Sequence, residues 1–451
     1  MLRPIFVVSI ILLGVAFSIQ GPFYMLLFYL WNAYFRPEYW LWWDFVSVLN
    51  ISLILGTFLL LRSVGYLHDF RWTGQTILLV LFLIQSAISL VASEHFAYSW
   101  VYWVEFIKVG IITLLITLHV NERRRYRLVL LVVGLSLGLE TAKQGWAQLV
   151  LNPGATNNNP NPFLGDNNGV ATGMMMLIPY FVALAQTSTR WWEKYIHRFF
   201  IIGLLYRGIS TYSRGGLLAA AALGLMALWW SPKKIRALIA IVVLAVVVGS
   251  VMPQSFYDRM NTINSSDDER DSSASSRIFF WQIGVRMANA KPITGVGFNG
   301  FRNSLATYDT SNGVYGTGRA VHSAWFGVLS EMGYPGFILF VLIIGNGLYI
   351  SWRIRWRARK DPALKDIKAY ASAMQMSLVA YVVGNTFLNG QYNEMFWHMV
   401  GLGIALQAIA EKAMAPVAEA PARAVLTKPA PLGAPLWPRA WTGHAGVRRQ
   451  Q

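Results

Sequence analysis

The stretch that decides the fold is residues 321–340, VHSAWFGVLSEMGYPGFILF. It passes from a polar loop into an apolar run, and roughly 20 apolar residues are enough to cross about 30 Å of hydrocarbon. A histidine, His322, and a glutamate, Glu331, lie near its start. Ionisable side chains are costly in lipid and are usually kept there for a function. The stretch therefore predicts a membrane helix with chemistry at the end that faces the loop.

The composition of the whole chain is also that of a membrane protein. Of its 451 residues, 55% are hydrophobic and 13% are charged, whereas soluble domains average about 25% charged residues. We expect an all-α, polytopic integral membrane protein with about 12–13 transmembrane helices. The first two apolar segments are short and make either two crossings or one. The expected segments are 4–19, 22–35, 46–62, 73–92, 99–119, 127–150, 168–186, 198–212, 215–230, 235–252, 322–351, 370–388 and 394–411.

The net charge of +17 does not indicate a nucleic-acid partner, because Lys and Arg cluster in short loops between the apolar segments. Cytoplasmic loops of membrane proteins carry such an excess. The strongest basic loops are each separated by two crossings, so all can lie in the cytoplasm; they are 121–127, 190–198, 232–236 and 353–368. The alternate loops then lie on the outer side of the membrane.

This topology predicts four regions. They are an N-terminal transmembrane bundle (1–252), a long periplasmic loop (253–321), C-terminal transmembrane helices (322–411) and a disordered cytoplasmic tail (412–451). A connection as long as 253–321 favours a functional role. Within it we expect an amphipathic helix from Ser276 to Ala290 that lies on the membrane. Its expected apolar face is Ile278, Trp281, Val285 and Ala288.

The sequence Ser213-Arg214-Gly215-Gly216 puts an arginine at an outer turn. The glycines allow a tight turn and a close approach by another group. Backbone N–H groups at the start of the next helix favour an anion. An arginine whose side chain merely reaches the membrane surface is an equally good interpretation.

More cationic side chains follow in the expected outer loop, namely Arg277, Arg286, Lys291 and Arg319. The planar guanidinium of arginine suits a diphosphate, because it offers a fork of donors and keeps its charge. Contact with anionic lipid headgroups is the alternative, and it is favoured for Arg286 and Lys291.

His322 has the chemistry of a general base near neutral pH. Glu331 lies nine residues further on, about 180° round a helix, so the two do not form a dyad on one face. For Glu331 a buried structural ion pair is the better interpretation. Two further charged pairs inside apolar segments have the spacing of neighbours on a helix, so the charges within each pair neutralise each other. They are Glu105 with Lys108 and Glu140 with Lys143. Lys143 could also line a cavity. The chain shows no acidic cluster at metal-ligand spacing, so neither a metal nor a cofactor is expected.

Three features, in this order, resemble the O-antigen ligase and O-antigen polymerase superfamily of envelope glycosyltransferases with a GT-C-like fold. The first is Ser213-Arg214-Gly215-Gly216 before a helix. The second is Arg-Ile-x-x-Trp from Arg277, followed by Pro-x-x-Gly-x-Gly to Gly297. The third is His322 with Glu331, Gly333 and Gly336. The aromatic-rich segment from Pro22 to Pro37 resembles the branch described as exosortase-associated O-glycosylation ligases.

The resemblance implies a metal-independent, inverting transfer from a glycan on undecaprenyl diphosphate. Arg214 and Arg277 would hold the diphosphate, and His322 would activate the acceptor hydroxyl. Residues implied to bind substrate are Arg319, Ser213, Lys143 and Arg286; those implied to support the site are Glu331, Gly215, Gly216, Gly333 and Gly336.

The resemblance further implies a site on the periplasmic side of the bacterial inner membrane. The acceptor is lipid A-core, a protein or a growing glycan, so ligase and polymerase both stay open. Intramembrane charged pairs and a long loop also suit a small-molecule or bicarbonate transporter, and a non-catalytic scaffold is a third alternative.

Overall fold

The computed structural model describes residues 2–40, 51–254, 256–257 and 272–415. Apart from one β-bridge between Asn161 and Gly165, the regular structure of these residues is helical. The helices are α1 (Leu2–Ser18), α2 (Pro22–Phe35), η1 (Pro37–Tyr39), α4 (Ile51–Ser63), η2 (Val64–Asp69), α5 (Gly74–Val91), α6 (Phe96–His119), α7 (Arg123–Leu151), α8 (Asn167–Thr187), α9 (Trp191–Ile209), α10 (Arg214–Trp230), α11 (Lys234–Val251), α13 (Ser272–Ala290), α14 (Phe301–Tyr308), α15 (Ala324–Arg357), η3 (Pro362–Leu364), α16 (Lys365–Asn385) and α17 (Glu394–Met414).

The prediction of an all-α, polytopic membrane protein is confirmed. Each expected apolar segment overlaps one of the helices, although residues 46–50 lie outside the described part of the chain. Within that part, six stretches are long and apolar enough to cross a membrane: Ile51–Asp69, Gly74–Val91, Phe96–His119, Arg123–Leu151, Asn167–Thr187 and Ala324–Arg357. The total of 12–13 crossings therefore stays a prediction, as does the number made by α1 and α2. Nearly all of the predicted disordered tail lies outside the described residues.

The four basic loops lie at one end of the helices. Arg123, at the start of α7, forms an ion pair with Asp366 of α16 at 3.2 Å. Arg127 of α7 pairs with Glu193 of α9 at 3.0 Å. The guanidinium of Arg355, near the end of α15, lies 3.7 Å from the ring centroid of Trp230 at the end of α10. These contacts connect all four loops, as the charge pattern predicted.

The alternate loops meet at the opposite end. The backbone N–H of Asn157, between α7 and α8, donates to the carbonyl of Ser210, between α9 and α10, at 2.8 Å. Arg36, after α2, lies 3.8 Å from Glu394 at the start of α17. The ammonium of Lys291, after α13, pairs with Glu94, between α5 and α6. We call this the loop end.

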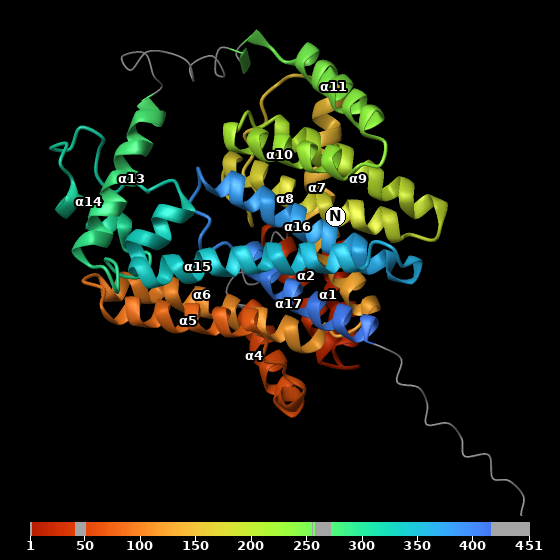
Figure 1. The fold of residues 1–451 in the computed structure, drawn as a ribbon, viewed down its shortest axis with the longest axis horizontal. Helices are drawn as coiled ribbons and strands as arrows, with labels where there is room; N and C mark the ends of the chain where they lie inside the picture. Colours follow the sequence, from red (N-terminus) through yellow and green to blue (C-terminus); the bar gives the residue numbers. More distant parts are fainter. Residues whose placement is uncertain (1, 41–50, 255, 258–271, 416–451) are drawn as a thin grey trace, which may run out of the picture. The chain divides into compact units, whose positions relative to one another are not determined.

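The long helix α15 lies between α5 and α6 on one side and α16 on the other (Figure 1). It is interrupted at Gly333, where φ is 66° and ψ is −167°, a conformation that essentially only glycine adopts. The break frees the N–H of Tyr334, which donates to the carbonyl of Pro292 at 2.8 Å. A Cβ on Gly333 would lie 2.4 Å from that same oxygen. The glycine therefore lets the turn after α13 dock into α15.

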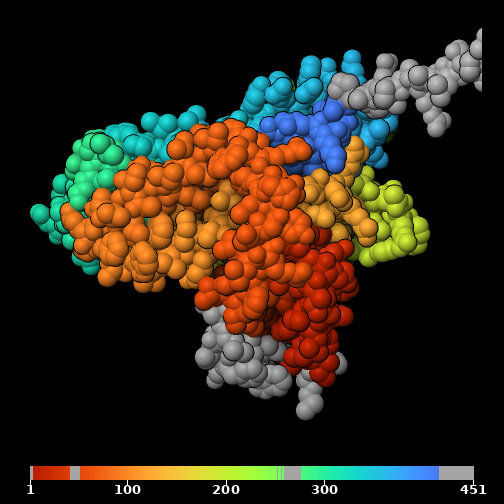
Figure 2. All heavy atoms as spheres, turned by 90° about the horizontal axis from the view of Figure 1, so that it is seen from below, coloured from red at the N-terminus to blue at the C-terminus, as the bar shows by residue number. Residues whose placement is uncertain are grey.

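The predicted apolar face of the loop helix was wrong at Ile278, which is 48% exposed, and right at Ala288, which is buried. The other large apolar side chains buried on α13 are Phe280, Ile283 and Met287. These three pack with Phe301 and Leu305 of α14 and with Val321 in one hydrophobic cluster. The helix thus buries its apolar face against protein, because α14 and α15 cover it. Figure 2 shows this region (green to teal) beside the orange helices α5 and α6.

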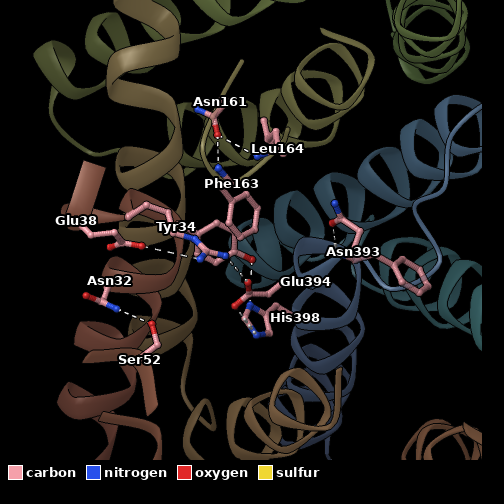
Figure 3. A network of polar contacts seen from close by, with 12 residues as sticks. Asn32, Tyr34, Glu38, Ser52, Asn161, Phe163, Leu164, Asn393, Glu394 and His398 are labelled. Carbon is pink, nitrogen blue, oxygen red and sulfur yellow. Dashed lines mark hydrogen bonds and ion pairs between the residues drawn. The ribbon is translucent and has the colours of Figure 1, made fainter. Parts of the chain in front are cut away.

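A polar cluster joins α2 and α17 at the loop end (Figure 3). The Tyr34 hydroxyl and Nδ1 of His398 are 3.1 Å apart. Nε2 of His398 lies 3.9 Å from Glu394, whose other oxygen faces Arg36. The ring of Phe163, from the loop before α8, packs on Tyr34 with centroids 4.5 Å apart. We call these five residues the Glu394 cluster; it ties the N-terminal helices to the C-terminal one.

Candidate functional site

His322 lies two residues before α15, between the buried side chains of Val321 and Ser323. Its φ is 51°, in the left-handed region, which is uncommon for a residue other than glycine. Such strain persists only when the surroundings impose it, and it is often found at functional sites. The backbone thus fixes the direction in which the half-buried imidazole leaves the chain.

The surroundings of His322 lower the pKa of its imidazole below the ordinary 6.5. Burial is the largest cause, and the positive charges of Arg277, Arg319 and Arg302 act in the same direction. The negative charge of Asp166 raises the pKa in part. At neutral pH the imidazole is therefore uncharged and able to accept a proton.

Arg277 lies on α13, which packs against the start of α15. Trp281, one turn after Arg277, stacks on Phe326, one turn after His322; the ring centroids are 5.3 Å apart and the planes 13° from parallel. The cationic charge that most strongly affects His322 is that of Arg277. The structure therefore brings these two predicted residues together.

Arg214 is the first residue of α10. The hydroxyl of Ser213 caps this helix by accepting from the N–H of Gly216 at 3.3 Å. A Cβ on Gly216 would lie 2.4 Å from the Cβ of Ala171, so the glycine allows α10 to pack closely on α8. The positive end of the α10 helix dipole and the Arg214 guanidinium make the region cationic.

One aromatic side chain, Phe387, connects the start of α10 with α13. A Cβ on Gly215 would lie 3.8 Å from the Phe387 ring. The same ring has its centroid 6.2 Å from that of Trp281, which stacks on Phe326. We call Trp281, Phe326 and Phe387 the aromatic cluster. The three motifs predicted from the sequence meet around it.

Arg207 fixes the Asn-rich loop beside this site. Its side chain is 1% exposed and donates to the carbonyls of Asn157 and Asn159 at 3.2 and 2.7 Å, and to Gln144 at 3.1 Å. The loop ends at Asp166, which caps α8 by accepting from Gly169 N–H at 2.9 Å. Arg207 is thus structural, and it positions the loop that carries Asp166.

Two residues predicted to bind substrate, Arg286 and Lys143, have side-chain contacts away from His322 and Arg277. Arg286 is nine residues from Arg277, on the opposite side of α13, and it donates to Thr310 at 2.5 Å. Lys143 pairs with Glu140 at 2.5 Å, in an apolar groove of about 730 Å³ between α1, α2, α7 and α9. The predicted pair Glu105–Lys108 is also formed, at 2.7 Å. Arg319 is exposed, but its charge acts on His322.

Glu331 is buried on α15, as predicted, but the groups that hold it are neutral. Its Oε2 accepts from the Tyr392 hydroxyl at 2.9 Å and from Gln391 Nε2 at 3.2 Å, and its Oε1 accepts from Phe301 N–H at 3.4 Å. The expected ion pair is therefore not formed within the described residues. Gly336, one turn after Glu331, lets α15 continue past its break, because a Cβ there would lie 2.3 Å from Met332 Cβ.

Sequence reasoning missed Asp166 and Phe387. Asp166 precedes an apolar helix, which is the pattern of an ordinary N-cap, and that pattern does not reveal that its charge reaches His322. Phe387 is one of 25 phenylalanines, and only the packing of α10, α13 and α16 distinguishes it. Both residues connect segments that are distant in sequence.

Comparison with known families covers both halves of this structure. The model of the O-antigen ligase family (Wzy_C) matches residues 199–341, which include Arg214, Arg277, His322 and Glu331. The model of a family of unknown function (DUF5935) matches residues 2–192. No curated protein matches the chain.

The fold and the site define a multi-pass, all-helical membrane protein with a cationic site at one end of its helices. The match over residues 199–341 supports the O-antigen ligase superfamily for this part of the chain.

Proposed function

We propose that this protein is a membrane glycosyltransferase that moves a glycan from an undecaprenyl-diphosphate donor to a hydroxyl acceptor. The observation that supports this best is that the segments carrying Arg214, Arg277 and His322 meet around one aromatic cluster. We call these three residues the Arg–His site. Two cations and one neutral base at a single site fit the displacement of a diphosphate by a hydroxyl.

The arginines would bind the diphosphate of the donor. Negative charge grows on this leaving group as its bond to the anomeric carbon breaks, so guanidinium groups stabilise the transition state more than the ground state. Arg214 acts with the N–H groups at the start of α10, whose helix dipole also favours an anion. The transfer needs no metal, because the guanidinium groups neutralise the diphosphate.

His322 would accept the proton of the acceptor hydroxyl. The acceptor oxygen bonds to the anomeric carbon from the face opposite the diphosphate, and the electrons of the broken bond leave with undecaprenyl diphosphate. The anomeric configuration is inverted. Burial and the neighbouring arginines lower the pKa of His322, which supports this role because the imidazole is then neutral at pH 7.

The transfer would take place at the periplasmic face of the bacterial inner membrane. The Arg–His site is at the loop end, opposite the basic loops, and an excess of Lys and Arg is typical of cytoplasmic loops. A lipid-linked donor would present its diphosphate at the same membrane surface.

A reconstituted assay tests the proposal. The full chain in lipid nanodiscs is given an undecaprenyl-diphosphate-linked oligosaccharide with lipid A-core, a glycan or a protein as acceptor. We expect release of undecaprenyl diphosphate and a gain of mass by one acceptor, with the same rate in excess EDTA. Gain by the lipid indicates a lipopolysaccharide ligase, gain by the protein an O-glycosylation ligase, and gain by the glycan a polymerase. Transport of the donor or of bicarbonate without any release would contradict the proposal.

A further inference from the structure

A polar cavity of about 220 Å³ lies beside the residue that precedes His322. Val321 forms part of its wall, together with Asn299, Asn389, Gln391 and Glu331. These residues come from the turn before α14, the start of α15 and the loop between α16 and α17. The cavity is thus at the loop end, one residue along the chain from His322, and it is separate from the apolar grooves of the membrane-spanning part.

One buried polar atom in this wall has no hydrogen-bond partner. Gln391 is 3% exposed, and its Nε2 donates to Glu331 while its Oε1 accepts from nothing. A buried amide oxygen without a partner costs free energy. This oxygen is closed off from solvent as it stands, so a ligand hydroxyl in the cavity would satisfy it only after the Gln391 amide turns.

The other wall is aromatic. Tyr98 and Tyr102, one turn apart on α6, line the cavity with ring centroids 4.8 Å apart. Tyrosine offers an apolar ring face next to a hydroxyl. Amide and carboxylate groups that donate and accept line the same cavity, together with the guanidinium of Arg302. Apolar ring faces and polar groups around one cavity complement a pyranose ring.

We propose that this cavity binds one hydroxyl-rich pyranose unit next to the reacting bond. This inference rests on the proposed function. The bound sugar would carry either the acceptor hydroxyl that His322 deprotonates or the anomeric carbon that this hydroxyl attacks. Asn389 would donate to a ring hydroxyl, and Tyr102 would cover the apolar ring face. Gln391 Oε1 would accept from a second hydroxyl once its amide has turned toward the cavity. The pyranose belongs either to the acceptor or to the donor glycan, and kinetics distinguish the two.

The test uses the full chain in nanodiscs with the donor and acceptor that it transfers. Asn389→Ala and Tyr102→Leu change exposed residues of the wall, and Gln391→Leu changes the buried one. Thr307→Ala is the matched control, because Thr307 is exposed on nearby α14 and does not line the cavity. Loss of one hydrogen bond or ring contact is worth about tenfold in affinity. We therefore expect Asn389→Ala and Tyr102→Leu each to raise one KM about tenfold, with kcat within about twofold of Thr307→Ala.

A raised KM for the acceptor assigns the pyranose to the acceptor, and a raised KM for the donor assigns it to the donor. Both KM values unchanged in Asn389→Ala and Tyr102→Leu would overturn the inference. Binding of free methyl pyranosides, measured by saturation-transfer NMR, needs no diphosphate. It therefore tests the cavity even if no transfer is found: equal signals from Asn389→Ala, Gln391→Leu and Thr307→Ala would again overturn it. A protein that binds sugar here but releases no undecaprenyl diphosphate would contradict only the proposed function.

Discussion

Trp281 stacks on Phe326 with ring planes 13° from parallel, and this contact holds α13 against the start of α15. Each ring is one helical turn after a residue of the proposed site, Arg277 and His322. The stack therefore sets the distance between a diphosphate-binding arginine and the general base. Its effect on the reaction is indirect, since neither ring needs to touch the reacting atoms.

Replacing Trp281 by alanine should lower glycan transfer more than it lowers stability. A misplacement of about 1 Å can cost up to about 100-fold in rate, so we expect kcat to fall by about 10- to 100-fold. Trp281→Phe keeps a stacked ring and should remain within about threefold of wild type. Steady-state kinetics beside thermal denaturation measure both effects. Equal kcat values for the alanine and phenylalanine variants would mean that the stack does not position the site.

The pH dependence of transfer should follow His322. Because burial and Arg277 lower its pKa below 6.5, the rate should be level near neutral pH and fall only as pH drops through that lowered pKa. Asp166→Asn removes a charge that raises the pKa, so the inflection should move to lower pH; asparagine still caps α8. Arg319→Gln removes a charge that lowers the pKa, so the inflection should move up. Profiles of kcat/KM that coincide for wild type and both variants would exclude His322 as the titrating base.

Gly333→Ala should destabilise the protein. Alanine would have to adopt a backbone conformation that costs about 1–3 kcal/mol, and its Cβ would clash with the carbonyl of Pro292. Gly345→Ala on the same helix is the control, because nothing lies within 4 Å of a Cβ there. Thermal denaturation in detergent should give a lower midpoint for Gly333→Ala alone. Matching midpoints for the two variants would contradict this account of the break in α15.

Tyr34→Phe should weaken the Glu394 cluster. The change removes the hydroxyl that bonds to the buried His398 ring, and a buried polar group left without a partner costs about 1–3 kcal/mol. Tyr349→Phe, at a position 53% exposed on α15, should leave the free energy of unfolding unchanged. Denaturation midpoints that are the same for both variants would show that the Tyr34 hydroxyl does not stabilise the junction of α2 and α17.

Much of the fold could be predicted from local patterns. Apolar runs fix where helices lie, since each helix must satisfy its own backbone in lipid, and basic loops fix which ends lie together. The face of α13 could not be predicted, because its sequence is apolar enough on two sides to suit either membrane or protein. Only the presence of α14 and α15 decides that Phe280 and Met287 are buried while Ile278 is not.

The candidate site was predictable where one short motif carries it, as at Arg214, Arg277 and His322. It was not predictable where the outcome depends on helix rotation. Arg286 lies on the other side of α13 from Arg277, and Lys143 lies in a different groove. Glu331 was expected to face a cation, but Tyr392 and Gln391, from a loop 60 residues further on, supply neutral donors instead.

The measurement that tests the central claim most directly separates donor binding from transfer in three variants. Wild type, Arg214→Ala, Arg277→Ala and His322→Ala are reconstituted in nanodiscs, and both the Kd for the undecaprenyl-diphosphate-linked donor and the rate of undecaprenyl diphosphate release are measured. We expect the two arginine variants to bind donor at least about tenfold more weakly and to lose transfer. His322→Ala should bind donor like wild type and lose transfer all the same. Near-wild-type release from all three folded variants would contradict the assignment of the Arg–His site.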